Sequence, residues 1–238
     1  MKTQSKKMNF FDHVNELRNR ILISILFICV FSIISYFFSA NIIDFLLEPA
    51  KNNEIVDFQV LKITSLFFVK MGISFIAGIL FSFPFIVYQL FKFIFPAFNN
   101  LSTNKIIIFT LACYFLFLIG LIFGYKIIIP FSISFFTQLS SGVDYIDLNY
   151  TLENYLSYIS WILIVSSLVF QLPFILTVIV KFGLLSLQDL TSYRKHIIVS
   201  FFILGALLTP PDPISQISIV IPLCLLFEFS IIFIRLTK

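Results

Sequence analysis

The residues able to take part in chemistry are few and lie scattered along an apolar chain. Both histidines, His13 and His196, lie in charged flanks, so no histidine cluster could bind a metal or haem inside an apolar run. The three cysteines lie within apolar runs, where a thiol behaves as a small hydrophobic group: Cys29, Cys113 and Cys224. No G-x-x-x-x-G-K phosphate-binding loop is present. We therefore expect no cofactor, no metal and no enzymatic activity, and no nucleic acid as a partner.

Composition assigns the chain to the membrane. Of 238 residues, 59% are hydrophobic and 12% charged, whereas soluble domains average about 45–50% apolar and 25% charged residues. Several uncharged runs contain the roughly 20 residues that a helix needs to cross a hydrocarbon core of about 30 Å. The sequence therefore predicts a polytopic membrane protein.

Reading between the charges predicts one all-α membrane domain over residues 1–238 with six spans. These spans lie at about 21–40, 71–91, 106–125, 154–180, 197–211 and 213–234. The apolar stretch 127–143 is interpreted as a broken extension of the third span, in which Pro130 ends regular helix.

Loop charges predict the orientation. With six spans, the termini and the loops on their side carry twelve Lys/Arg and four acids, whereas the opposite loops carry four Lys and eight acids. Because positively charged loops stay inside, both termini are expected on the cytoplasmic or matrix side.

The segment 8–20, ahead of the first span, has an amphipathic pattern. Apolar residues recur at three- and four-residue spacing, which predicts a helix lying along the interface. Its polar side carries His13, Glu16 and Arg20, of which Glu16 and Arg20 are spaced for an i,i+4 ion pair. From spacing alone, an ordinary amphipathic collar anchored by basic residues explains this segment.

Gln171 stands near the middle of the fourth span, next to Pro173. A glutamine amide in hydrocarbon seeks a partner, either on another helix of this chain or on a second protein. Hydrogen bonds between helices within one chain are common and worth about 0.6–2 kcal/mol, so spacing alone favours internal contact.

The fifth and sixth spans are joined by a tight turn, residues 209–216. Asp212 is placed to cap the last span, and Thr209 and Gln216 are expected to flank the tip as unpaired side chains. Prolines end the fifth span, so its helix covers only about 18–20 Å, less than the apolar core. The hairpin is therefore a predicted docking site for a polar group on an incoming helix.

Several motifs together resemble one family. Residues 13–20 match an H-x-x-E-L-R-x-R opening, and four further motifs follow in order: F-G-Y…P…F-F at 123–136, F-[QE]-x-P at 170–173, T-P-P-D-x-x-S-Q at 209–216 and [YF]-E at 227–228. The sequence thus resembles the TatC family, the multispanning subunit of the twin-arginine protein translocase.

The resemblance implies a cup-shaped receptor of six helices that binds twin-arginine signal peptides of folded proteins. Transport in that family uses the proton-motive force together with TatA/TatB-type single-span partners. Carried over by position, Glu16 would pair with a signal arginine, and the surrounding site would comprise His13, Arg18, Arg20, Phe93 and Ser102. Ser102 stands where the family usually has glutamate, which leaves one motif carboxylate for two arginines. Lys126 stands where the family tends to have an aromatic residue.

The resemblance further implies partner-helix contacts at Gln171, Thr209 and Gln216, and structural roles for Pro49, Pro173, Asp212 and Glu228. Self-association is also expected. The competing class is a secondary transporter or channel for a small solute or ion, but such proteins typically show related halves with broken helices, and no internal repeat is found. The 33 Phe residues suggest the codon bias of an AT-rich genome. Together with the form of the hairpin motif, this favours the mitochondrial inner membrane, with the bacterial inner membrane as the alternative.

Overall fold

The chain folds as an all-α membrane protein. The computed structural model describes residues 10–51, 57–94, 103–140, 149–181, 183–208 and 213–236. The helices are α1 (Phe10–Phe37), α2 (Ser39–Lys51), α3 (Ser65–Ile94), α4 (Thr103–Phe123), the π-helix η2 (Gly124–Ile128), α5 (Ile129–Ser140), α6 (Leu152–Val169), α7 (Leu172–Lys181), α8 (Leu187–Ser192), α9 (Arg194–Leu208) and α10 (Pro213–Leu236). Two short strands, β1 (Asp57–Gln59) and β2 (Asn149–Thr151), pair in parallel.

Five helical stretches in the described part of the chain are long and apolar enough to cross a membrane. They are His13–Phe37, Ser65–Ile94, Asn104–Gln138, Leu152–Lys181 and Gln216–Leu236. The predicted fifth span falls in α9, whose fifteen residues keep it out of this group. A sixth crossing therefore stays a prediction.

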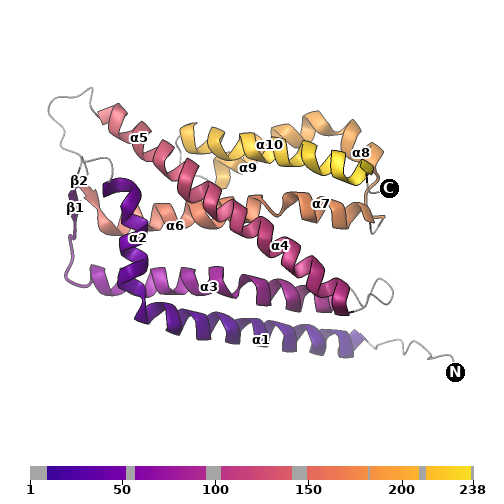
Figure 1. The fold of residues 1–238 in the computed structure, drawn as a ribbon, viewed down its shortest axis with the longest axis horizontal. Coiled ribbons are helices and arrows are strands. Elements are labelled where there is room, and N and C mark those ends of the chain that lie inside the picture. Colours follow the sequence, from indigo (N-terminus) through magenta and orange to yellow (C-terminus); the bar gives the residue numbers. More distant parts are fainter. Residues whose placement is uncertain are drawn as a thin grey trace.

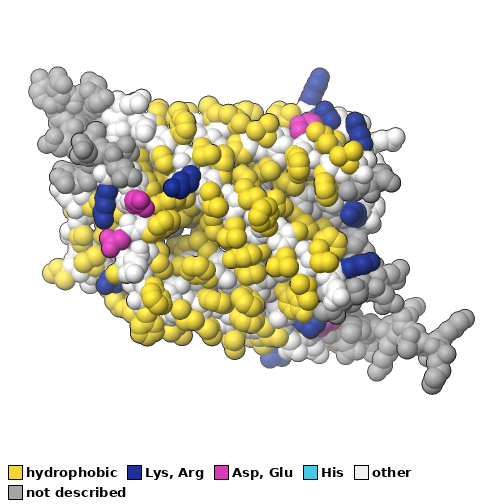
Figure 2. All heavy atoms as spheres, viewed as in Figure 1, with side chains coloured by type: hydrophobic (Ala, Val, Ile, Leu, Met, Phe, Trp, Pro, Cys, Tyr) yellow, Lys and Arg dark blue, Asp and Glu magenta, His cyan; other side chains and the backbone are white. Residues whose placement is uncertain are grey.

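Both ends of the described chain lie at one end of the bundle, and α2 lies across the opposite end (Figure 1). We call these the termini end and the α2 end. Hydrophobic side chains cover the middle of the visible face, whereas most of the Lys and Arg side chains gather toward the two ends (Figure 2). This distribution suits a bilayer, whose hydrocarbon lies between two polar interfaces.

Helix α1 packs along α3 at a point where both backbones come close. A Cβ atom added at Gly78 would lie 2.8 Å from the Cα atom of Ser32. Ser74 and Ser82, one helical turn to either side of Gly78, are buried as well. In lipid, helices associate largely through such close van der Waals contact, which small residues permit.

The crossing of α4 with α6 uses the same principle. Cβ atoms added at Gly120 and Gly124 would lie 2.7 Å from the Cα atom of Ser167 and 2.3 Å from the Oγ atom of Ser166. The two glycines are spaced by four residues, so they lie on one face of the helix. They hold the long stretch α4–η2–α5 against the centre of the bundle.

Two prolines act on the helices in opposite ways. Pro173 lacks an N–H group and its ring conflicts with the carbonyl of Val169, so α6 ends at Val169 and α7 begins at Leu172. The prediction that Pro130 ends regular helix is wrong, because α5 continues to Ser140. In the preceding π-turn the N–H of Ile129 bonds to the carbonyl of Gly124, and this widened pairing accommodates the missing donor.

The amphipathic segment is continuous with the first span. No Gly or Pro interrupts residues 10–37, and α1 runs through them as one helix of 28 residues. The prediction that segment 8–20 lies along the interface is therefore wrong for its described part, which extends the spanning helix. The chain then turns at Phe38 into α2, a helix that the sequence analysis did not anticipate.

The α1–α3 contact can be tested by adding one methyl group. Gly78→Ala should lower the free energy of unfolding in detergent by about 1–3 kcal/mol, because the new atom overpacks the backbone of Ser32. Gly72→Ala, in the same helix, is the matched control, since nothing lies within 4 Å of its added Cβ. That control should be neutral or gain up to about 1 kcal/mol from helix propensity. Equal stabilities of the two variants would contradict the close crossing.

Candidate functional site

A hydrogen-bonded chain of polar groups joins α1 to α3 toward the termini end. Arg20 donates to a carboxylate oxygen of Glu16 at 2.9 Å, so the predicted i,i+4 pair is confirmed. The other terminal nitrogen of Arg20 donates to the Oε1 atom of Gln89 on α3 at 3.0 Å. Sequence reasoning missed Gln89, because nothing in the spacing of α1 indicates which residue of a distant helix it faces.

The same two helices bring His13 and Phe93 together. Their rings stack with centroids 4.4 Å apart and planes inclined by 17°. Both residues were assigned to one site by the family resemblance, from motifs far apart in the sequence. Arg18 is exposed on α1, whereas Ser102 lies outside the described residues.

Glu16 keeps acceptor positions beyond those used in its ion pair with Arg20. The side chains of Glu16 and Arg20 are 22% and 19% exposed, so neither is fully surrounded by protein. A carboxylate has about four acceptor positions, and the bond from Arg20 leaves others accessible. Since hydrogen bonds between ions are stronger than neutral ones, a guanidinium beside the His13–Phe93 stack is a chemically suitable ligand.

Gln171 lies at the break between α6 and α7 and is 6% exposed. Its amide nitrogen donates to the carbonyl of Cys113 on α4 at 3.2 Å and lies 3.5 Å from the carbonyl of Ser167. Gln171 thus connects helices within the chain. Its Oε1 atom is buried without a hydrogen-bond partner in the described structure.

The α9–α10 hairpin contains a cross-helix bond that the sequence analysis did not foresee. The amide nitrogen of Gln216 donates to the carbonyl of Phe202 at 3.1 Å, so the prediction of an unpaired Gln216 is wrong. Gly205 permits this approach, since an added Cβ would lie 2.7 Å from a methyl group of Val220. Thr209 and Asp212 lie outside the described residues, and the capping role of Asp212 stays a prediction.

The structure also describes three residues to which the resemblance assigns structural roles: Glu228, Pro49 and Pro173. Glu228 on α10 forms an ion pair with Arg194 on α9 at 3.4 Å. Pro49 is buried in α2 and Pro173 is buried at the start of α7.

Helix α8 lies in the connection between α7 and α9. It begins with a capping box formed by Ser186 and Asp189. Hydrogen bonds from the side chain and backbone of Ser186 hold the pKa of Asp189 below its usual value.

Comparison with known proteins agrees with this architecture. A family profile described as "Sec-independent protein translocase protein (TatC)" matches residues 12–222. The chain is 32% identical to such a protein from Desulforapulum autotrophicum, over 98% of this chain and 86% of the relative. It is also 32% identical to one from Aquifex aeolicus, with 92% of each chain covered.

Solved structures give the same result. A crystal structure described as the twin-arginine translocase receptor TatC superposes with a TM-score of 0.84 at 31% identity, covering 95% of this chain and 100% of that one. A second crystal structure of that receptor, in the detergent DDM, superposes with a TM-score of 0.81. The profile match and the agreement in fold, which both extend over nearly the whole chain, show that this multi-pass membrane protein belongs to the TatC family of protein-transport components.

Proposed function

We propose that this chain is the receptor subunit of a twin-arginine translocase, which binds twin-arginine signal peptides and moves folded proteins across a membrane. The observation that carries the proposal is the convergence of the His13–Phe93 stack and the Glu16–Arg20–Gln89 chain on two neighbouring helices. The superposed crystal structures are those of a twin-arginine translocase receptor, which supports the same assignment. A small-solute transporter is not favoured, because the relatives are protein translocase subunits.

At the proposed signal-peptide site, the incoming arginine binds the acceptor positions of Glu16 that the bond from Arg20 leaves open. The bond from Arg20 to Gln89 holds the Arg20 guanidinium in place beside the ligand. Arg18 and His13 add positive or aromatic surface around Glu16, which restricts the directions from which a second cation can approach. The proton-motive force, rather than nucleotide hydrolysis, supplies the energy in this proposal.

A second region of the proposed mechanism contacts single-span partners of the TatA/TatB type. Gln171, Thr209 and Gln216 are the proposed contact positions. Gln171 supports this role through its Oε1 atom, which is buried without a donor and would accept a hydrogen bond from a polar side chain of an inserted helix. The relatives named above are bacterial; residence in a mitochondrial membrane and self-association stay predictions.

Removing the charge of Glu16 should strongly weaken signal recognition. Glu16→Gln should reduce photocrosslinking to a twin-arginine precursor by about ten- to a hundredfold, since a hydrogen bond to a charged group contributes about 1.5–3 kcal/mol. Asp44→Asn, which removes a carboxylate from α2 at the opposite end, is the control and should crosslink normally. Undiminished crosslinking of Glu16→Gln would refute the assignment.

Restoring the second carboxylate should strengthen recognition. Ser102→Glu supplies the residue that the family usually has at this position, so precursor affinity should rise at low ionic strength and fall back as salt screens the new charge. Binding measured at low and at high salt checks this. An affinity that is unchanged at low salt would exclude position 102 from the site.

Cysteine crosslinking tests the hairpin. In a background without the three native cysteines, Thr209→Cys and Gln216→Cys should form adducts with a single-span partner. Ile232→Cys, on an exposed face of α10 nearer the termini end, should form few. Equal yields at all three positions would indicate random collision in the membrane rather than docking.

A further inference from the structure

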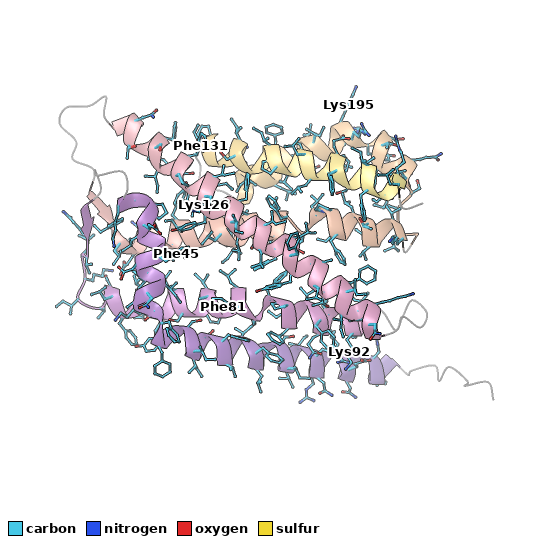
Figure 3. All side chains as sticks on the ribbon, viewed as in Figure 1. Phe45, Phe81, Lys92, Lys126, Phe131 and Lys195 are labelled. Atoms are coloured by element: carbon cyan, nitrogen blue, oxygen red, sulfur yellow. The ribbon has the colours of Figure 1, made fainter. Side chains whose placement is uncertain are left out.

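A cavity of about 540 Å³ opens beside α2, between α3, α4, η2 and α6. Its walls are almost entirely apolar and include Phe45 and Phe81. Figure 3 places Lys126 next to Phe45, on the face that Figure 2 shows as mainly hydrophobic and hollowed beside α2. A Lys side chain therefore lies at one end of an apolar cavity.

Lys126 and Glu48 both line this end of the cavity without pairing with each other. The Nζ atom of Lys126 lies 5.9 Å from the centre of the Tyr125 ring, and no carboxylate among the described residues forms an ion pair with it. The Tyr125 hydroxyl lies 3.2 Å from Glu48 and 2.8 Å from the carbonyl of Phe45, which fixes the carboxylate at the cavity edge. Ionisable groups in an apolar span are costly unless they meet a partner.

The position of Lys126 along its helix matches the depth of lipid headgroups. From Asn104, where the apolar stretch begins, to Lys126 the helix rises about 33 Å. A hydrocarbon core is about 30 Å thick, and the tilt of this helix in the bundle (Figure 1) reduces the depth it covers. Lys126 therefore lies near the hydrocarbon boundary at the α2 end, with the apolar cavity walls extending from it toward the bilayer centre.

The apolar walls and the two charged groups at one end indicate the kind of occupant. A single acyl chain is narrow, apolar and flexible enough to fill the cavity. A cation and an anion at the same mouth are together complementary to a headgroup that carries both charges.

We propose that this cavity binds one acyl chain of an ethanolamine phospholipid, whose phosphate pairs with Lys126 and whose primary amine donates to Glu48. The site is separate from the signal-peptide site and goes beyond the proposed function. It accounts for a lysine at a position that in the family tends to be aromatic: an ammonium binds phosphate as a compact point charge. The amine of ethanolamine can donate hydrogen bonds to Glu48, whereas the methylated ammonium of choline cannot.

Native mass spectrometry of the purified full chain tests this proposal. The protein is titrated with phosphatidylethanolamine, phosphatidylcholine and phosphatidylglycerol of identical acyl chains. Wild type should retain one ethanolamine lipid about tenfold more strongly than either of the others. Lys126→Met should lose about tenfold in affinity for all three lipids, because all three carry the phosphate. Glu48→Gln should lose the preference for ethanolamine and keep the phosphate contact.

Lys195→Met, which removes an exposed lysine at the opposite end of the bundle (Figure 3), is the control and should bind as wild type does. Circular dichroism and gel filtration verify that each variant is folded, and Lys126→Met removes a charge from an apolar stretch, which favours insertion. Equal retention of the three lipids by wild type, or unchanged binding by Lys126→Met, would overturn the proposal. If the Lys126→Met variant bound all three lipids as wild type does but no longer co-purified with a single-span partner, the cavity would be assigned to a protein instead of a lipid.

Discussion

Close approach of helix backbones at a few small residues is the constraint on which this bundle depends. Apolar side chains gain little by leaving lipid for each other, so association requires dense contact. Gly78 against Ser32 joins α1 to α3, Gly120 against Ser167 joins α4 to α6, and Gly205 against Val220 joins α9 to α10. Each crossing sets the distance at which polar groups elsewhere on the same two helices meet.

The polar contacts between helices follow from these crossings. Arg20 reaches Gln89 because α1 and α3 run in contact along their length, and Gln216 reaches the carbonyl of Phe202 across the crossing at Gly205. Gln171 and Gln216 both donate an amide N–H to a backbone carbonyl of another helix. A backbone carbonyl is a suitable acceptor because it is present whatever side chain its residue carries.

Much of this structure was predictable because its signals are local or belong to the family. Apolar runs indicate membrane-spanning helices, and a spacing of four residues indicates the Glu16–Arg20 pair. The resemblance grouped His13 with Phe93, whose rings the fold brings into contact. Other features depend on contacts between elements far apart in the sequence, and no local pattern indicates them: the bond from Arg20 to Gln89 is one. The continuation of helix through Pro130 was missed because a π-turn shifts the pairing by one residue, which a rule about proline alone does not include.

The small buried fraction of α1 bears on the order in which the receptor is made. Only 6% of the residues in the most apolar part of α1 are buried by the rest of the protein. Helix α3 is its principal neighbour. Because so little of α1 is buried, this helix can be inserted into the bilayer with lipid around it before α3 has been synthesised. Glu16 has no Gln89 to organise Arg20, and His13 has no Phe93 to stack on, until the second long helix has been inserted completely. Until then the chain presents only an ordinary amphipathic helix end, and the proposed signal-peptide site is completed in a single step late in the insertion of α3.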